Sequence, residues 1–249
     1  RGLVGSEMCI RDRCKSKQKK TKSFLHLTKT DFAFAKKTTI HFRFRVKFYN
    51  FAHQIQQKKN MDIKEIINKR YAMPDASLHK LQRCLTEVSY PKGFQVLKRG
   101  KVEKNIFFIK KGIVRAYTPV DGKQITFWFG KEGATIVSLK GYVNDEPGYE
   151  TMELMEDSVL YKLERKQLKE LFLDDLHIAN WGRRYAEMEL LATEERLISM
   201  LSAIASERYK ELLEKEPDLL QRLPLGSIAT YLGVTQASLS RIRAKITQP

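Results

Sequence analysis

Side chains that can recognise DNA bases lie close together near the end of the chain. Gln236 can form paired hydrogen bonds with adenine, Arg241 can do so with guanine, and Ser238 can bond to either kind of base edge. Phosphate contacts orient a protein on DNA without reading its sequence. Four neighbouring side chains suit that second role: Thr235, Ser240, Arg243 and Lys245. The segment therefore predicts a surface for double-stranded DNA, with Gln236, Ser238 and Arg241 on one side of a helix.

Two helices joined by a tight turn would hold these side chains in place. Such a helix-turn-helix needs a small residue inside its first helix, a glycine at the turn and apolar residues beneath its second helix. Six residues of the segment 225–243 meet these needs: Ile228, Ala229, Leu232, Gly233, Leu239 and Ile242. Thr235 precedes the second helix and is placed to cap its first turn. The alternative is a helical hairpin that only packs against the rest of the protein.

The net charge of the chain is concentrated in two segments. Its 249 residues include 46 Lys and Arg against 29 Asp and Glu, a formal charge of +17 at pH 7. Residues 1–60 hold 16 bases and 3 acids, residues 61–221 hold 26 of each, and residues 222–249 hold 4 bases and no acid. The acid-free C-terminal segment favours a nucleic-acid partner, whereas most of the excess charge belongs to the first sixty residues.

The basic segment of residues 1–60 has three interpretations. Residues 1–13 resemble a translated sequencing adapter, and the Lys- and Phe-rich remainder resembles translated non-coding sequence. On that interpretation Met61 is the natural start and the segment is non-native or disordered. Alternating basic and aromatic residues are also typical of an arm for single-stranded nucleic acid, and an acid-poor basic composition of a transit peptide. We expect the first interpretation and consider the fold from residue 61 onward.

Several classes of protein are disfavoured by what the sequence lacks. It has no apolar run of about 18 residues that would span a membrane, so we expect no membrane partner. Three cysteines give no disulfide framework, which indicates a reducing, cytoplasmic location. Residues 61–249 hold one cysteine, Cys84, and lone histidines at His79 and His177, too few ligands for a cluster or metal. Without a phosphate-binding loop, dinucleotide fingerprint or nucleophile elbow, we expect no enzyme, catalytic residue, metal or cofactor.

A series of short strands is expected between residues 90 and 165. Apolar runs alternate with turn residues there, and Asp121-Gly122 between two β-rich runs is a strong hairpin signal. The expected strands are residues 94–97, 105–110, 113–118, 124–129, 135–139, 150–154 and 158–163. Strands repeated at this spacing indicate a β sandwich or barrel.

The order of glycines and apolar runs in this region resembles that of the Crp/Fnr regulators. The resemblance rests on Gly93, Gly100, the run Ile106–Ile109, Lys111-Gly112, Asp121-Gly122 and Gly133. It continues through residues 207–224, which look like the lead-in to the DNA-binding domain in the Bacteroidetes-type branch of that family. The resemblance implies a cyclic-nucleotide-binding-like jelly roll around a small-molecule site, then a dimerisation helix and a C-terminal winged-helix or helix-turn-helix domain.

The effector pocket implied by this resemblance departs from the family members that bind cyclic AMP. Those members carry a Gly-Glu pair at the start of the binding segment and an Arg-Ser/Thr pair near its end. This chain has Val137-Ser138 at the start and no arginine between Arg115 and Arg165. Three acids in the segment would repel a phosphate: Asp145, Glu146 and Glu150.

Five residues correspond to the effector pocket of the family: Val137, Ser138, Leu139, Tyr149 and Thr151. Because bidentate phosphate recognition favours arginine, we predict no response to cyclic AMP. The pocket would then hold another, unidentified small-molecule effector or form a structural core.

Beyond residue 165 the apolar period changes from two residues to 3.6. Apolar residues from Ile178 to Ala205 step by three and four and trace one face of a long helix. A second helix is expected over Ala205–Lys215, ending before Pro217. In the Crp/Fnr regulators the long helix pairs with its twofold mate, which implies a homodimer. The alternative is a helix that only packs on the jelly roll.

The predicted fold class is α+β, with four segments. Residues 1–60 are the leader, 61–165 the jelly-roll sensor domain, 166–205 the dimerisation helix region and 206–249 the helix-turn-helix domain. The predicted function is a DNA-binding transcription regulator that binds a palindromic site as a homodimer. The alternative function is a small-molecule-binding sensor whose helical C-terminus mediates protein contacts.

Overall fold

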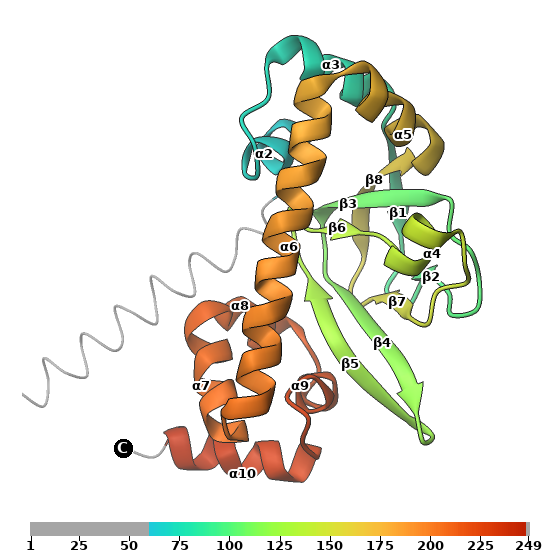
Figure 1. The fold of residues 1–249 in the computed structure, drawn as a ribbon. Coiled ribbons are helices and arrows are strands. Elements are labelled where there is room, and N and C mark those ends of the chain that lie inside the picture. The colour runs from blue at the N-terminus through green and yellow to red at the C-terminus, as the bar shows by residue number, and fades with distance from the viewer. Residues whose placement is uncertain (1–59, 248–249) are drawn as a thin grey trace, which may run out of the picture. The chain divides into compact units, whose positions relative to one another are not determined.

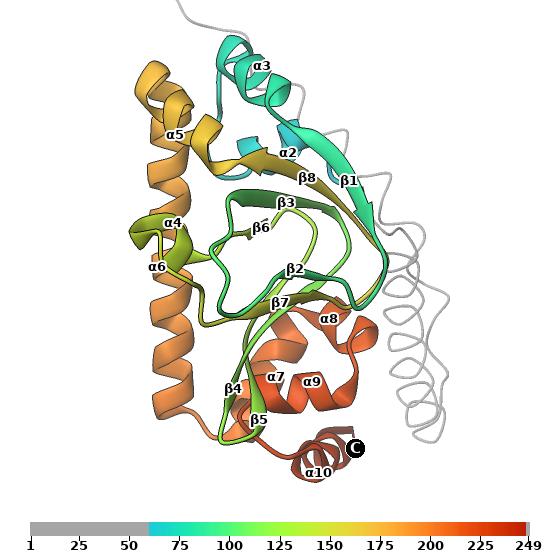
Figure 2. The same ribbon diagram turned by 90° about the vertical axis from the view of Figure 1, so that its right-hand side faces the viewer.

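Two four-stranded antiparallel sheets form the centre of the protein (Figure 2). The computed structural model describes residues 60–247, so the interpretations of residues 1–59 lie outside the described residues. One sheet has the order β1 (Thr86–Tyr90), β8 (Ser158–Glu164), β3 (Asn105–Lys111), β6 (Thr135–Ile136). The other has the order β2 (Gln95–Leu97), β7 (Thr151–Leu154), β4 (Val114–Val120), β5 (Lys123–Gly130). The expected jelly roll is confirmed.

Strand β3 shows how the sequence builds two cores at once. Phe107 and Ile109 point between the sheets, where they join Val114, Ile136 and Leu160. Ile106 and Phe108 alternate with them and point to the opposite face, which helices cover. Successive side chains of a strand face opposite sides, so a strand covered on both faces reads as a continuous apolar run.

The Asp121-Gly122 hairpin forms as its sequence predicts. Asp121 has a φ of 49° and Gly122 a φ of 74°, and Val120 pairs with Lys123 across the turn. Two successive residues of positive φ match the right-handed twist of the joined strands. The turn connects β4 to β5, which form the long hairpin in Figure 1.

Four helices cover the outer face of the β1-β8-β3-β6 sheet (Figure 1). They are α2 (Ile63–Asn68), α3 (Asp75–Arg83), α5 (Arg165–Asp174) and the first turns of α6 (Leu176–Ser202). Asp175 caps α6, because its carboxylate accepts from the N–H groups of His177 at 3.0 Å and Ile178 at 3.3 Å. The Phe108 and Trp181 rings meet at 5.8 Å between centroids. This cluster fixes the start of α6 on the jelly roll.

The apolar residues of α6 do not share one environment. Ile178 and Trp181 are buried, whereas Leu197 and Leu201, in the last two turns of the helix, are 57% and 79% exposed. The jelly roll covers the first half of the helix, and the described chain leaves apolar side chains of the second half uncovered. A periodic apolar pattern predicts a helix face, but it does not say which part of the face this chain itself buries.

Four further helices form a separate apolar core at the end of the chain. They are α7 (Ala205–Lys215), α8 (Pro217–Arg222), α9 (Leu225–Tyr231) and α10 (Gln236–Thr247). No strand follows β8 in residues 60–247, so this region is helical. A winged-helix domain would include strands after its helices, and the described part of the chain has none there.

One expected strand is shorter than predicted, and a short helix follows it. Strand β6 ends at Ile136, and Ser138 then caps α4 (Leu139–Asn144), with its Oγ accepting from the Gly141 N–H at 3.4 Å. The expectation of a strand over residues 135–139 was therefore wrong at its end. A serine that can cap a helix outweighs the apolar residues around it.

Candidate nucleic-acid interface and sensor site

Helices α9 and α10 are joined by a tight turn whose geometry depends on Gly233. Its φ of 69° lies in the left-handed region that glycine adopts without strain. The Val234 N–H donates to the Ala229 carbonyl at 3.0 Å and closes the turn. Ala229 and Leu239 are both buried where the helices meet. The small residue, the glycine and the buried leucine thus occupy the positions expected for them.

Thr235 caps α10, as predicted. Its Oγ1 accepts from the Ser238 N–H at 3.1 Å and donates to the Ser238 Oγ at 2.9 Å. The hydroxyl is therefore engaged twice within the protein. A phosphate contact by Thr235 would have to replace the second of these bonds.

The three candidate base contacts do not share one side of α10. With about 100° between successive helical residues, Ser238 and Arg241 project about 60° apart, whereas Gln236 projects about 140° from Arg241. The Gln236 side chain approaches the first turn of α9, where a Cβ added to Gly226 would lie 3.4 Å from its Oε1. Gln236 and Arg241 are exposed and Ser238 is half-buried. Gln236 therefore lies at the start of α10, apart from Ser238 and Arg241, which lie on one face of the helix.

The side chains expected to contact phosphates follow α10 along its exposed surface. Ser240, Arg243 and Lys245 are all exposed. Leu239 of the same helix is buried, and Ile242 and Ile246 pack against the C-terminal core. At about 100° per residue, Arg243 borders this apolar face, whereas Ser240 and Lys245 project farther from its centre. The apolar face fixes α10 in its orientation, and the basic and hydroxyl side chains are left on the solvent side.

Two arginines from outside this segment support the turn. The Arg196 guanidinium lies 3.6 Å from the centroid of the Tyr231 ring and donates to the Tyr231 carbonyl at 2.8 Å. Arg208 donates to the Leu232 carbonyl at 2.8 Å. Both place positive charge at the carbonyl end of α9, which helix dipoles favour. Sequence reasoning missed them, because they come from α6 and α7 and no spacing links them to the turn.

Arg222 is the base of the C-terminal segment that does not lie on α10. Its guanidinium bonds bidentately to Glu132, at 2.7 and 3.0 Å, and to Glu156 at 2.6 Å. Lys131 extends the network with an ion pair to Asp218 at 3.0 Å. Burial would lower the pKa of Arg222, but its two carboxylate partners outweigh this and raise it. Three bases of the acid-free segment, rather than four, are thus presented by α10.

Strand β5 also contacts α9 directly. The hydroxyls of Thr126 and Thr230 are 2.7 Å apart, and the rings of Phe129 and Tyr231 lie 5.0 Å apart. Thr126 is held in turn by Arg115, whose Nε donates to its Oγ1 at 2.8 Å. The β4–β5 hairpin and the α9–α10 pair therefore share a packed polar and aromatic contact.

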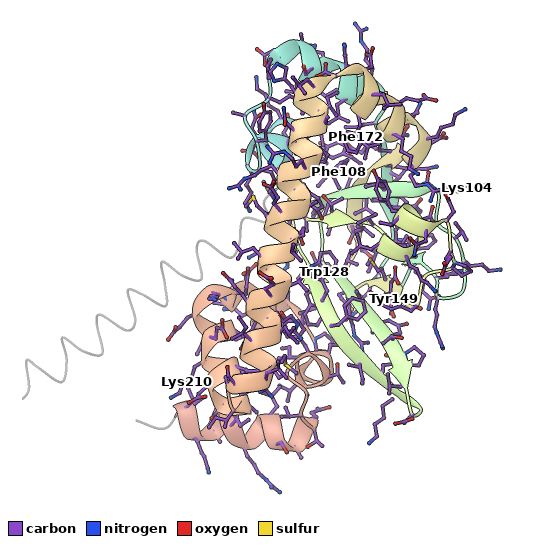
Figure 3. The ribbon with its side chains drawn as sticks, viewed as in Figure 1. Lys104, Phe108, Trp128, Tyr149, Phe172 and Lys210 are labelled. Atoms are coloured by element: carbon purple, nitrogen blue, oxygen red, sulfur yellow. The ribbon has the colours of Figure 1, made fainter. Side chains whose placement is uncertain are left out.

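The five residues expected to line the effector pocket are dispersed in the structure. Ser138 and Thr151 are both buried, and the Thr151 Oγ1 accepts from the Arg99 N–H at 3.4 Å. Val137 packs toward the helix-covered side of the sheet, and Leu139 is 62% exposed. Tyr149, labelled in Figure 3 between α4 and β4, is 53% exposed. The structure thus brings Ser138 inward and leaves Leu139 and Tyr149 at the surface.

The residue that joins Ser138 is Glu150. It is only 3% exposed, and a Cβ added to Gly148 would lie 2.7 Å from the Ser138 Oγ and 3.1 Å from each carboxylate oxygen of Glu150. Sequence reasoning treated Glu150 only as a group that repels phosphate. The acidic character of the segment is the signal that could have drawn attention to this residue.

Within residues 60–247, no group of three His, Cys, Asp or Glu side chains is arranged to hold a metal ion. None of the helices described there has the length and apolar character needed to cross a membrane.

Comparisons with known proteins agree with this fold. Residues 87–175 match the family described as the cyclic nucleotide-binding domain. None of the curated proteins compared with the chain matches it.

Solved structures with the same fold include bacterial regulators. The chain is similar to FixK2 from Bradyrhizobium japonicum, at 22% identity and a TM-score of 0.57, over 65% of this chain and 84% of that chain. It is similar to the c-di-GMP-responsive global regulator CLP of Xanthomonas campestris, at 15% and 0.58, over 70% and 91%. A third is a putative transcriptional regulator of the Crp/Fnr family from Eubacterium rectale, at 16% and 0.57, over 70% and 83%. The fold is therefore a cyclic-nucleotide-binding jelly roll followed by a long helix and further helices.

Proposed function

We propose that this protein is a Crp/Fnr-type transcription regulator that binds a palindromic DNA site as a homodimer and does not respond to cyclic AMP. Residues 61–165 act as the sensor, residues 166–205 as the dimerisation region and residues 206–249 as a helix-turn-helix DNA-binding domain. The observation that carries the proposal is α10, which is capped at its start, anchored by a buried apolar face and lined on its solvent side by Arg241, Arg243 and Lys245 without an acid.

Base contacts are assigned to Gln236, Ser238 and Arg241, in the first two turns of α10. Thr235, Ser240, Arg243 and Lys245 contact phosphates. Arg241 is the strongest base reader of this set, because its guanidinium can bond bidentately to guanine and it is exposed on the solvent side. Gln236 reads from the helix start, after its side chain leaves the neighbourhood of Gly226.

Dimerisation is supported by the uncovered apolar face in the second half of α6. It consists of Leu190, Leu191, Leu197, Ile198, Leu201 and, just beyond the helix, Ile204, each more than half exposed. A contiguous apolar face of this size on a soluble helix is typical of a protein interface. A second copy of the same helix is the partner that a twofold DNA site requires, with half-sites about 34 Å apart.

DNA binding is tested by a mobility shift of the full chain on a selected palindromic duplex. We expect Arg241→Ala to weaken binding to this duplex about tenfold or more, since a bidentate base contact contributes about 1–3 kcal/mol. The matched control is Arg83→Ala, which removes an exposed arginine of α3, the helix farthest from α10 in Figure 1. Equal affinity of Arg241→Ala and the control would favour the alternative, in which the helical C-terminus contacts another protein.

The absence of a cyclic AMP response is tested on the same material. We expect micromolar cyclic AMP to change neither the melting temperature nor the affinity for the duplex, because the buried acid at Glu150 opposes a phosphate. A rise of several degrees in melting temperature would contradict this part of the proposal.

A further inference from the structure

Glu150 is a buried carboxylate whose charge is unmatched. It is 3% exposed, and its Oε2 has no hydrogen-bond partner within the described chain. None of the ion pairs among residues 60–247 involves it. Burying an unpaired carboxylate costs several kcal/mol, so such groups are usually paired or bind a ligand. An orphaned acid inside a sensor domain therefore calls for a partner that is absent from the chain itself.

The cations of the surrounding segment are engaged elsewhere. Lys140 pairs with Glu146 at 2.8 Å. Arg165 reaches the segment from the end of β8, but its guanidinium bonds to the Gly141 carbonyl and the Asp145 carboxylate. These contacts hold α4 in place and leave the Glu150 charge uncompensated.

The carboxylate points to the inside of the jelly roll. Met152 and Leu154 of β7 belong to the core between the sheets, and Glu150 continues the same alternation two residues earlier. Ser138 likewise follows Ile136 of that core by two residues. Both polar groups lie close to Gly148, where an added Cβ would collide with the Ser138 Oγ and crowd both carboxylate oxygens of Glu150. The two side chains thus converge from opposite sheets.

The surroundings suit an organic cation. The Tyr149 ring lies 6.0 Å from that of Phe127, and both burial and the charge of Glu150 raise the pKa of Tyr149, so its ring lies within the field of this carboxylate. Aromatic faces attract cations. Leu139 and Val143 of α4 are exposed apolar side chains beside the same segment and can cover a short hydrocarbon part.

We propose that this end of the jelly roll binds a small organic cation with N–H donors, an ammonium or guanidinium compound, whose charge pairs with Glu150 and whose N–H groups reach Ser138. The ligand enters beside α4, whose only buried residue is Gly141. This inference rests on the sensor role in the proposed function and names the chemical class of its effector.

Binding is tested by calorimetry and thermal melting of the full chain with n-propylammonium and guanidinium chlorides at millimolar concentration. We expect saturable binding of at least one of the two. Tetramethylammonium, a cation without N–H donors, should bind at least about tenfold more weakly, the loss expected for removing charge-assisted hydrogen bonds. Glu150→Gln should abolish binding, and it should raise the melting temperature of the ligand-free protein by about 2 °C or more, because it removes an unpaired buried charge.

The matched control is Glu146→Gln, which removes an acid from the same loop at an exposed position. It should leave binding and the ligand-free melting temperature unchanged. The proposal is overturned if neither probe binds, or if Glu150→Gln binds them as well as the wild type does. Measuring the DNA affinity of the same preparations separates the two ideas. If the wild type binds DNA but neither cation, this inference alone is overturned. If the wild type does not bind DNA, the proposed function is overturned.

Discussion

Gly112 is the residue at which a single added methyl group would have the clearest effect. Its φ is 122°, and a Cβ added there would lie 2.0 Å from the Ser158 Oγ and 2.6 Å from the Ser158 Cβ. Its N–H also donates to Glu132 at 2.9 Å. Backbone conformation and close packing therefore both depend on the absence of a side chain at this position.

We predict that Gly112→Ala destabilises the protein by about 3 kcal/mol or more, from an unfavourable φ and a steric clash together. Gly100→Ala is the matched control, because Gly100 has a φ of 77° but open space around it. Gly100→Ala should lower the free energy of unfolding by about 1–2 kcal/mol, from the backbone strain of a positive φ alone. Urea denaturation of both variants measures the difference, and equal losses would contradict the steric argument.

Thr235 allows a second prediction at the level of one residue. Thr235→Ala removes the acceptor for the Ser238 N–H and should destabilise the protein by about 1 kcal/mol, whereas Thr235→Ser should retain most of the stability. Denaturation in the absence of DNA measures the cap alone. A fully stable alanine variant would show that the cap contributes nothing.

Among the helices, α8 is tied to the jelly roll by charge. Arg222 joins Glu132, before β6, and Glu156, between β7 and β8, and all three side chains are at most 17% exposed. A mostly buried pair contributes little in net terms, but removing one partner leaves the other charges unpaired. This cluster of Arg222, Glu132 and Glu156, which we call the clamp, therefore fixes the position of the C-terminal helices on the jelly roll.

We predict that Arg222→Met destabilises the protein by about 3 kcal/mol, because two carboxylates lose their partner. The control is Arg183→Met, which breaks an exposed pair with Glu187 on α6 and should cost at most about 0.5 kcal/mol. Thermal or urea unfolding measures both. Similar losses in the two variants would mean that the clamp is no stronger than a surface ion pair.

The clamp also sets a pH dependence. Burial would raise the pKa of Glu132, but hydrogen bonds from Arg222 and from the Gly112 N–H outweigh it and hold the pKa below its ordinary value of about 4.5. The unfolded chain then binds the proton at a higher pH than the folded chain. The stabilisation is complete above pH 4.5 and is lost as the pH falls through the lowered pKa.

We therefore expect the free energy of unfolding to fall between pH 5 and pH 3, and to fall less steeply in Arg222→Met, where the main group that lowers this pKa is gone. Denaturation at a series of pH values measures the two slopes. Identical slopes would show that Glu132 does not contribute.

At the scale of the whole molecule, the second half of α6 and the C-terminal helices are linked. The same helix offers an uncovered apolar face, through Leu197 and Leu201, and supports the α9–α10 turn, through Arg196. A dimer formed through α6 would thus set the spacing of the two DNA-binding helix pairs. The contact between β5 and α9, through Thr126 and Thr230, joins the jelly roll to the same C-terminal helices.

We predict that the double variant Leu197→Glu, Leu201→Glu is monomeric, because two carboxylates would replace apolar contacts at the centre of the interface. Light scattering after gel filtration should give the mass of one chain, 29.0 kDa, instead of twice that value. Leu173→Glu is the control, since Leu173 on α5 is 92% exposed and lies outside the α6 face. A dimer in the double variant would exclude this face as the interface.

Signals between neighbouring residues determined much of this protein from its sequence alone. Apolar runs with glycine turns predicted seven of the jelly-roll strands to within a few residues, and Asp121-Gly122 predicted its hairpin. The α9–α10 pair and its Thr235 cap were equally readable, because the turn, the cap and the buried face all lie within twenty residues. Strand β1 and the helices α2, α3, α4, α5 and α8 were missed, since their local signals are short or ambiguous.

Only the tertiary structure decided which charges meet. Arg222 finds its carboxylates 66 and 90 residues away, so it serves the clamp instead of the DNA surface. Glu150 has no cationic partner among residues 60–247, which makes it a candidate ligand-binding group and not only a group that repels phosphate. Gln236 turns toward α9 instead of joining Arg241 on one face. Local conformation follows from neighbours in the chain, but the partner of a charge depends on folding, which brings distant segments within a few ångströms.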